Sequence, residues 1–213
     1  VIVDHGNFSM GNVEYLNLNT KYANGTVGFA NVLNLDCDHA QSIMIDKVQD
    51  LNLHKGTHSK VKVSGLYYAR ITGTYLDVDV AEVHETAEIA DLRHSSVSMS
   101  KINKRCEFRG VNYCQINVKV SKTNCEPRIL VPDASFSDIV VSIPKTLKVS
   151  CLLRSNYGKT EFDVPSSMKQ HVVENTKDYS QTRMHTLLNT TTFTPSSVID
   201  IKNSRGNIII KGY

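Results

Sequence analysis

Apolar residues in this chain recur as short alternating pairs at a nearly constant spacing. One position marks the repeat and is always aromatic or histidine, and successive markers are 17 to 23 residues apart. An apolar pair follows most markers by three and five residues, as in Val61/Val63, Val78/Val80 and Ile116/Val118. The markers are His5, Tyr22, His39, His58, Tyr75, His94, Tyr113, Phe136 and Tyr157.

A second alternating pair precedes every marker except the first, and in most coils the residue between its members is polar. Alternation with a period of two predicts strands that bury one face and expose the other. The pairs Val27/Phe29 and Ile43/Ile45 come one or two residues late, which a turn insertion explains. The clearest second pairs are Leu16/Leu18, Leu33/Leu35, Leu51/Leu53, Ala69/Ile71, Ala87/Ile89 and Cys106/Phe108, and the outward positions are Asn17, Asn34, Asn52, Lys62, Asp79, Ser98 and Asn117.

A repeat of roughly 18 residues is too small to fold alone, because its few inward side chains do not offset the backbone entropy that folding removes. Neighbouring repeats must therefore share a core and a backbone hydrogen-bond ladder. Equal repeats whose strands all run the same way predict an all-β fold, a single-stranded parallel β-solenoid (β-helix). The spacing predicts about nine to ten coils of roughly 18 residues each.

The repeat pattern is interrupted once, near the end of the chain. Residues 1–163 are predicted to form the coils, and 164–197 is a polar insertion that either covers an edge of the stack or forms a loop. The alternation returns as Ile199/Ile201 and Ile208/Ile210. Residues 198–213 are therefore predicted to be the final coil of the same domain.

Composition narrows the function classes. Of the 213 residues, 40% are hydrophobic and 21% charged, which is typical of a folded domain rather than a disordered chain or a coiled coil. A net charge of +3 gives no reason to expect a nucleic-acid partner. No apolar run is long enough for a transmembrane segment. The chain begins Val1-Ile2-Val3 without a secretion signal, so we expect a mature protein or a fragment whose signal peptide is missing.

The histidines of the marker position suggest a metal site, since His39 and His58 occupy adjacent coils and their side chains could come within about 5 Å. A metal site needs three or four ligands, however, and phenylalanine or tyrosine fills the same position in other coils. We therefore predict that the position is used for ring stacking at a turn. No metal and no cofactor is expected.

The five cysteines are Cys37, Cys106, Cys114, Cys125 and Cys151. Their odd number and the lack of a C-x-x-C spacing indicate neither a zinc site nor a disulfide framework. Cys106 and Cys125 are 19 residues apart and are predicted to stack as small apolar fillers, with a disulfide as the alternative. Cys114 directly follows a turn marker and is predicted to be the most exposed.

Catalytic carboxylates are the remaining candidates, because many parallel β-helix proteins cleave polysaccharides with acidic and basic groups on one outer face. Asp36, Asp38, Asp77 and Asp79 alternate along strands or turns without a basic column beside them. Arg70, Arg93 and Arg109 occupy different repeat positions. We predict a solvated surface with no catalytic residue, while a site formed across coils stays open.

The repeats resemble the adhesin-like β-solenoid families of bacterial envelope proteins, including the auto-transporter adhesin-like head domains. The resemblance covers nearly the whole chain except 164–197. Its residues are the turn Lys21-Tyr22-Ala23-Asn24, the related Asn112-Tyr113 and Asn156-Tyr157-Gly158, the outward asparagines of the Leu-Asn-Leu strands, and Gly206-Asn207-Ile208-Ile209-Ile210. It implies a secreted or envelope-located protein without catalytic activity, and it supplies no catalytic residues.

We therefore expect a non-catalytic, adhesin-like structural or binding module at the cell envelope or outside the cell, whose partner is a glycan or a protein at the cell surface. One alternative is a carbohydrate-active β-helix enzyme, either a polysaccharide lyase or a hydrolase. The other is a scaffold that associates with itself edge to edge. An enzyme requires two carboxylates, or a carboxylate and an arginine or lysine, within about 5–10 Å on an outer face.

Overall fold

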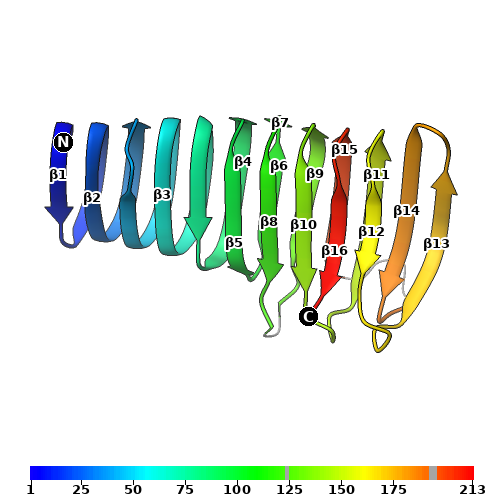
Figure 1. The fold of residues 1–213 in the computed structure, drawn as a ribbon. Coiled ribbons are helices and arrows are strands. Elements are labelled where there is room, and N and C mark those ends of the chain that lie inside the picture. The colour runs from blue at the N-terminus through cyan, green and yellow to red at the C-terminus, as the bar shows by residue number, and fades with distance from the viewer. Residues whose placement is uncertain (123–124, 192–195) are drawn as a thin grey trace.

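A computed structural model describes residues 1–122, 125–191 and 196–213. Residues 192–195 of the predicted insertion lie outside the described residues. Every helix or strand element that the structure describes is a β-strand, and together they form one parallel β-solenoid, as predicted (Figure 1). Regular winding runs through about seven turns, from Ile2 to Val120. That is fewer than the nine to ten coils expected. β9 and β10 continue the stack in sequence order, and the next coil, formed by β15 and β16, is inserted out of sequence order.

The strands differ greatly in length, because several corners of the solenoid keep their extended backbone and one strand then runs across more than one wall. The sixteen strands are β1 (Ile2–Met10), β2 (Val13–Asp38), β3 (Ile43–Val80), β4 (Val83–Arg93), β5 (Ser96–Ile102), β6 (Arg105–Arg109), β7 (Val111–Asn112), β8 (Gln115–Val120), β9 (Arg128–Ser135), β10 (Asp138–Ile143), β11 (Val149–Asn156), β12 (Thr160–Asp163), β13 (Gln170–Lys177), β14 (Gln181–Leu188), β15 (Val198–Ser204) and β16 (Ile208–Gly212).

The core consists of columns in which each inward side chain packs against its equivalent in the next coil. Leu33 lies opposite Leu51, and Leu35 lies opposite Leu53. All four of these leucines are at most 1% exposed. The predicted alternation of buried and outward positions is therefore confirmed, and it gives the solenoid two long walls.

We call wall 1 the outer face of the strands that precede the markers, and wall 2 the outer face of the strands that follow them. Wall 1 includes Asn17, Asn34, Asn52, Arg70, Glu88 and Glu107, and wall 2 includes Ser9, Thr26, Lys62, Asp79, Ser98 and Asn117.

One predicted inward pair, Val27/Phe29, is wrong. The residues that point inward are Gly25 and Val27, which lie opposite Ile43 and Ile45, whereas Phe29 is 38% exposed. Gly25 also lies opposite Phe8 of the preceding coil, and a Cβ at Gly25 would be 2.5 Å from the Phe8 ring. Glycine takes this inward position because the neighbouring phenylalanine already fills the space.

The C-terminal strands do not lie at the end of the stack. β15 pairs in parallel with both β9 and β11, and β16 pairs in parallel with both β10 and β12. In Figure 1 the red C-terminal strands accordingly lie between the green and the yellow coils. The last coil in the sequence is thus inserted between two coils that precede it in the chain. Its inward residues Ile199, Ile201, Ile208 and Ile210 are fully buried.

The segment between β12 and β15 contains an antiparallel hairpin rather than another coil. β14 pairs antiparallel with β11, and β13 then forms the outer strand. The pairing of β13 with β14 shifts register between Val172 and Glu174. An irregular edge of this kind discourages further strand pairing, so the hairpin both covers β11 and blunts this end of the solenoid.

The inserted coil predicts a local loss of stability in the variant Gly206→Ala. Gly206 has φ +117°, and a Cβ there would overlap the carbonyl of Ser137. We expect a loss of roughly 1–3 kcal/mol in urea unfolding. Since β11 and β12 reach the preceding coils through β15 and β16, hydrogen exchange should accelerate from β11 to β14 and stay unchanged in β2 and β3.

Gly11→Ala is the matched control, because nothing lies within 4 Å of a Cβ at Gly11. Its stability should stay within about 0.5 kcal/mol of the parent chain. Equal acceleration of exchange in all coils would contradict the proposed dependence of the distal coils on β15 and β16.

Candidate functional site

The marker residues form one corner of the solenoid, where the chain passes from wall 1 to wall 2. All nine have a positive φ, between 46° and 62°. Residues with a side chain rarely adopt this left-handed conformation. Here it reverses the chain sharply and leaves each ring partly exposed at the corner, with Tyr75, for example, 50% exposed.

The rings of adjacent coils stack into a continuous row, which we call the ring column. From His5 to Phe136, neighbouring ring centroids are 4.6 to 5.0 Å apart. Stacked aromatic pairs contribute about 0.5–1.5 kcal/mol each beyond the area they bury, which helps to offset the unfavourable backbone conformation. The ring faces are covered by their neighbours, so the column offers mainly ring edges to a partner.

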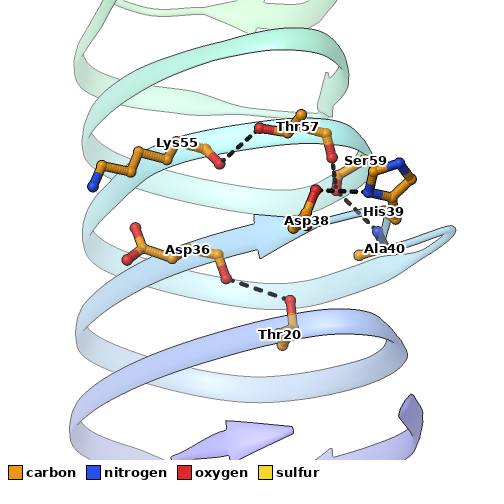
Figure 2. A network of polar contacts seen from close by, with 8 residues as sticks. All are labelled: Thr20, Asp36, Asp38, His39, Ala40, Lys55, Thr57 and Ser59. Carbon is orange, nitrogen blue, oxygen red and sulfur yellow. Dashed lines mark hydrogen bonds and ion pairs between the residues drawn. The ribbon is translucent and has the colours of Figure 1, made fainter. Parts of the chain in front are cut away.

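The geometry of His39 and His58 supports stacking rather than metal binding. Their centroids are 4.8 Å apart and their planes are inclined by 17°. The nitrogen lone pairs lie in the ring planes, so two nearly parallel rings do not direct them at one ion. In addition, Nδ1 of His39 is 2.7 Å from Oδ1 of Asp38 (Figure 2). Within the described ranges, no group of three His, Cys, Asp or Glu residues is arranged to hold a metal ion.

One member of the column is not aromatic and was missed from the sequence. Arg205 has φ +65° and lies between Phe136 and Tyr157. Its guanidinium carbon is 5.0 Å from the Phe136 centroid and 5.8 Å from the Tyr157 centroid. A planar cation can stack on aromatic faces, so the inserted C-terminal coil continues the column without a ring.

Serine hydroxyls link neighbouring coils just after the ring position. Oγ of Ser59 accepts a hydrogen bond from the Ala40 amide at 3.0 Å and donates one to the Thr57 carbonyl at 2.7 Å (Figure 2). Ser95 and Ser137 make the equivalent pair of bonds two and four coils further along. The left-handed turn displaces one amide from the regular ladder, and in alternate coils a hydroxyl supplies its acceptor.

On wall 1, the outward asparagines form a hydrogen-bonded ladder. Nδ2 of Asn34 donates to Oδ1 of Asn17 at 2.7 Å, and Nδ2 of Asn52 donates to Oδ1 of Asn34 at 3.0 Å. A carboxamide both donates and accepts, so identical amides in register satisfy one another. The hydroxyl of Tyr15 accepts a further bond from Asn34 at 2.8 Å.

The four aspartates considered from the sequence do not form one site. Asp36 lies on wall 1 opposite His54, and Asp38 lies at the corner beside His39. Asp77 and Asp79 lie on wall 2, where Oδ2 of Asp77 is 2.9 Å from Nζ of Lys60.

The arginines considered from the sequence all belong to wall 1 or its end. Arg93 is exposed and lies opposite Asn112, just before the ring of His94. Nε of Arg70 is 3.5 Å from Oε2 of Glu88, and Nε of Arg109 is 2.5 Å from Oε1 of Glu107. Arg70 and Arg109 therefore pair with glutamates that were not among the candidates from the sequence.

Glu107 is the centre of the densest charge cluster on wall 1. It lies opposite Glu88, and its side chain is only 6% exposed. Oε1 accepts from Arg109 and Oε2 from Arg105, each at 2.5 Å. The hydrogen bond from Arg109, reinforced by that from Arg105, holds the pKa of the Glu107 carboxyl below its usual value against the opposing effect of burial.

The cluster contains the groups required of a β-helix glycosidase or lyase, yet Glu107 is poorly suited to catalysis. Both of its oxygens are occupied, it is almost inaccessible, and its lowered pKa keeps it ionised, so it has no proton to donate at neutral pH. The sequence contained a signal for this contact. The inward pairs Ala87/Ile89 and Cys106/Phe108 are equivalent in adjacent coils, so the residues between them, Glu88 and Glu107, must be neighbours on the outer face.

Cys106 is a buried filler as predicted, but its predicted stacking on Cys125 and the predicted exposure of Cys114 are wrong. Cys106 lies opposite Ile129, not Cys125, because the connection between β8 and β9 shifts the register. Cys114 is only 2% exposed and its Sγ donates to the Asn112 carbonyl at 3.2 Å, whereas Cys125 is the partly exposed one. All five thiols are free, and burial raises the pKa of Cys37 to about 11. A thiol of this kind is a core filler rather than a nucleophile.

Substitutions of Tyr75 test whether the ring column depends on ring shape. Tyr75→Ala removes contacts with the rings of His58 and His94 and should lower the free energy of unfolding by roughly 1–3 kcal/mol. Tyr75→Phe keeps the ring and should be within about 0.5 kcal/mol of the parent in urea unfolding. Tyr179→Ala, at a 99% exposed position, is the control. A large loss in Tyr75→Phe would show that the hydroxyl, not the ring, is essential.

Glu107→Gln tests the arginine cluster. Removing the charge leaves two guanidiniums without their carboxylate, so we expect a loss of roughly 1–3 kcal/mol at pH 7. The pKa of Glu107 is lower in the folded chain than in the unfolded chain. The ionised carboxylate therefore contributes its full stabilisation at a pH above the pKa of the unfolded chain. That stabilisation is lost as the pH falls through the pKa of the folded chain. The difference between variant and parent should therefore shrink near pH 3.

Glu88→Gln is the matched control for the same wall, since its ion pair is longer and more exposed. Its effect on urea unfolding should stay below about 1 kcal/mol. A Glu107→Gln deficit that is independent of pH would mean that packing, not charge, accounts for the loss.

Comparison of the chain with protein-family models, with curated proteins and with solved structures finds no match. In the part of the chain that the structure describes, no helix is long and apolar enough to cross a membrane. Function therefore has to be inferred from the two walls and the ring column themselves.

Proposed function

We propose that this chain is a non-catalytic, adhesin-like binding module whose outer walls contact a glycan or a protein at the cell surface. The observation that carries the proposal is the row of polar side chains held in register along wall 1, beginning with Asn17, Asn34 and Asn52. Their amide–amide bonds of 2.7 and 3.0 Å fix the side chains before any partner arrives. Preorganised groups lose less entropy on binding than free ones.

A solenoid wall suits a partner that is itself repetitive. Equivalent groups recur at the strand spacing of about 4.8 Å, so successive units of a linear glycan can meet successive coils. Weak contacts repeated along one rigid surface add up to useful avidity. The cell-envelope or extracellular location in this proposal is supported by the resemblance of the turns and Leu-Asn-Leu strands to bacterial adhesin-like solenoids.

A carbohydrate-active enzyme is the second candidate, favoured by the meeting of Glu88 and Glu107 with Arg70, Arg105 and Arg109 on wall 1. The ion pairs of Glu107 argue against an enzyme, because they occupy both of its carboxylate oxygens.

Edge-to-edge self-association is the third candidate. β1 pairs only with β2 among the described strands, and Ile2 is 82% exposed there.

One experiment separates the three candidates. The chain is applied to an array of linear bacterial and animal glycans, the bound glycans are analysed for new chain ends, and light scattering follows apparent mass against concentration. An adhesive module should be retained on at least one glycan without cleaving it, and Asn34→Ala should weaken retention because it interrupts the amide ladder.

The other outcomes each overturn the proposal. New reducing or unsaturated ends would identify an enzyme. A mass that rises with concentration, without glycan retention, would identify a self-associating scaffold. Retention unchanged in Asn34→Ala but lost in a wall 2 variant such as Lys62→Gln would reject wall 1 as the contact surface.

A further inference from the structure

Two arginines of neighbouring coils face each other on wall 1. Arg105 of β6 and Arg128 of β9 are partners in the parallel register, and both are exposed. Like charges directly opposite one another on adjacent strands destabilise a sheet. Asparagine or threonine fills other wall 1 positions and would avoid this repulsion. The presence of two arginines therefore suggests a role other than stabilising the sheet.

Arg105 is held in a fixed position by the buried carboxylate described above. Its Nη2 donates to Oε2 of Glu107 at 2.5 Å, while Arg109 occupies the other oxygen. Part of the Arg105 guanidinium remains available, because its side chain is still 44% exposed. Glu107 thus positions one guanidinium and leaves its remaining donors directed at solvent.

The side chain of Arg128 has no hydrogen bond or ion pair with any residue in the described ranges. The neighbouring Lys104, in contrast, is already bound, with its Nζ at 2.7 and 2.6 Å from the two oxygens of Glu85. Among the described residues, Arg128 is therefore a cation of this region without an acceptor, and Arg105 is only partly engaged.

A hollow of about 630 Å³ lies beside the two arginines, and both line it. Its other charged residues are Lys104, Glu82 and Glu126. Glu82 accepts a bond from Asn103 at 3.2 Å, and Glu126 is exposed and lies within 4 Å of no cation in the described residues. The hollow thus combines the unpaired guanidinium of Arg128 and the remaining donors of Arg105 with enough space for a sugar ring.

We propose that Arg105 and Arg128 bind the carboxylate of a uronic acid in a linear acidic glycan. This inference rests on the surface-binding role proposed above and names its ligand class. Strands about 4.8 Å apart hold the two guanidiniums so that one carboxylate can accept charge-assisted bonds of about 2.7–2.9 Å from both. The bound anion then removes the repulsion between them.

The surrounding charges favour a glycan over a nucleic acid. Glu82, Glu88, Glu107 and Glu126 lie around the pair, and a closely spaced phosphate backbone would meet them as well. Each sugar of a uronic acid glycan carries free hydroxyls as well as its carboxylate, so it can place the carboxylate at the arginines and donate hydrogen bonds from its hydroxyls to the glutamates.

The test measures binding of a galacturonic acid trimer to the whole chain by calorimetry at low salt. We expect saturable binding that is at least about tenfold weaker in Arg105→Gln and in Arg128→Gln. Lys62→Gln, which removes one positive charge from wall 2, should bind normally. The methyl-esterified trimer, which lacks the carboxylates, should not bind.

Arg128→Glu separates binding from folding. It replaces the repulsive pair by an attractive one, so it should raise the urea midpoint while abolishing binding of the trimer. Simultaneous loss of stability and binding would overturn the proposal, as would equal weakening by Lys62→Gln, which would indicate net charge alone. Binding of a sulfated glycan without binding of the galacturonate trimer would overturn the carboxylate assignment.

This test can fail independently of the proposed function. If the chain is retained on neutral glycans and Arg128→Gln has no effect, the adhesive role stands and the arginine site is rejected. If no glycan of either kind is retained, both the arginine site and glycan binding by the outer walls are rejected.

Discussion

The whole molecule depends on the parallel, in-register pairing of each coil with the next. No coil buries enough apolar surface alone, so the ladder between coils and the columns inside it are what make the fold stable. This pairing also imposes a rule on every surface position, because it sets equivalent residues opposite one another at the strand spacing. Each column must therefore consist of side chains that can pack against an identical side chain, or that pair with a different side chain in the next coil.

The columns satisfy that rule by different chemistry. Leu33 packs against Leu51, and the rings from His5 to Phe136 stack on one another. Asn17, Asn34 and Asn52 form hydrogen bonds with one another, in which their side chains serve as donors and acceptors. Carboxylates cannot do this, and Glu88 above Glu107 is tolerated because arginines on the same wall pair with both. The pair of Arg105 and Arg128 is satisfied on one side only, because Glu107 pairs with Arg105 and no described residue pairs with Arg128.

The sequence was sufficient for features that repeat locally. The alternation of apolar pairs predicted the parallel solenoid, and the recurrence of rings predicted a stacked corner. The sequence was insufficient where the order of the coils in the stack differs from their order along the chain. Spacing alone does not reveal that β15 and β16 enter between earlier coils, nor that Arg205 takes a ring position there. Gly25 was missed for another reason, since its inward role is set by the size of Phe8 in the neighbouring coil.

The arginine pair lies beside the connection that joins β8 to β9. Two residues connect β5 to β6, whereas seven connect β8 to β9. Cys125 and Glu126 of this longer connection line the hollow beside Arg105 and Arg128. Wall 1 thus offers two kinds of contact. Its regular coils present asparagines held in register, whereas the hollow beside Arg105 and Arg128 adds guanidinium donors that the asparagine ladder does not supply.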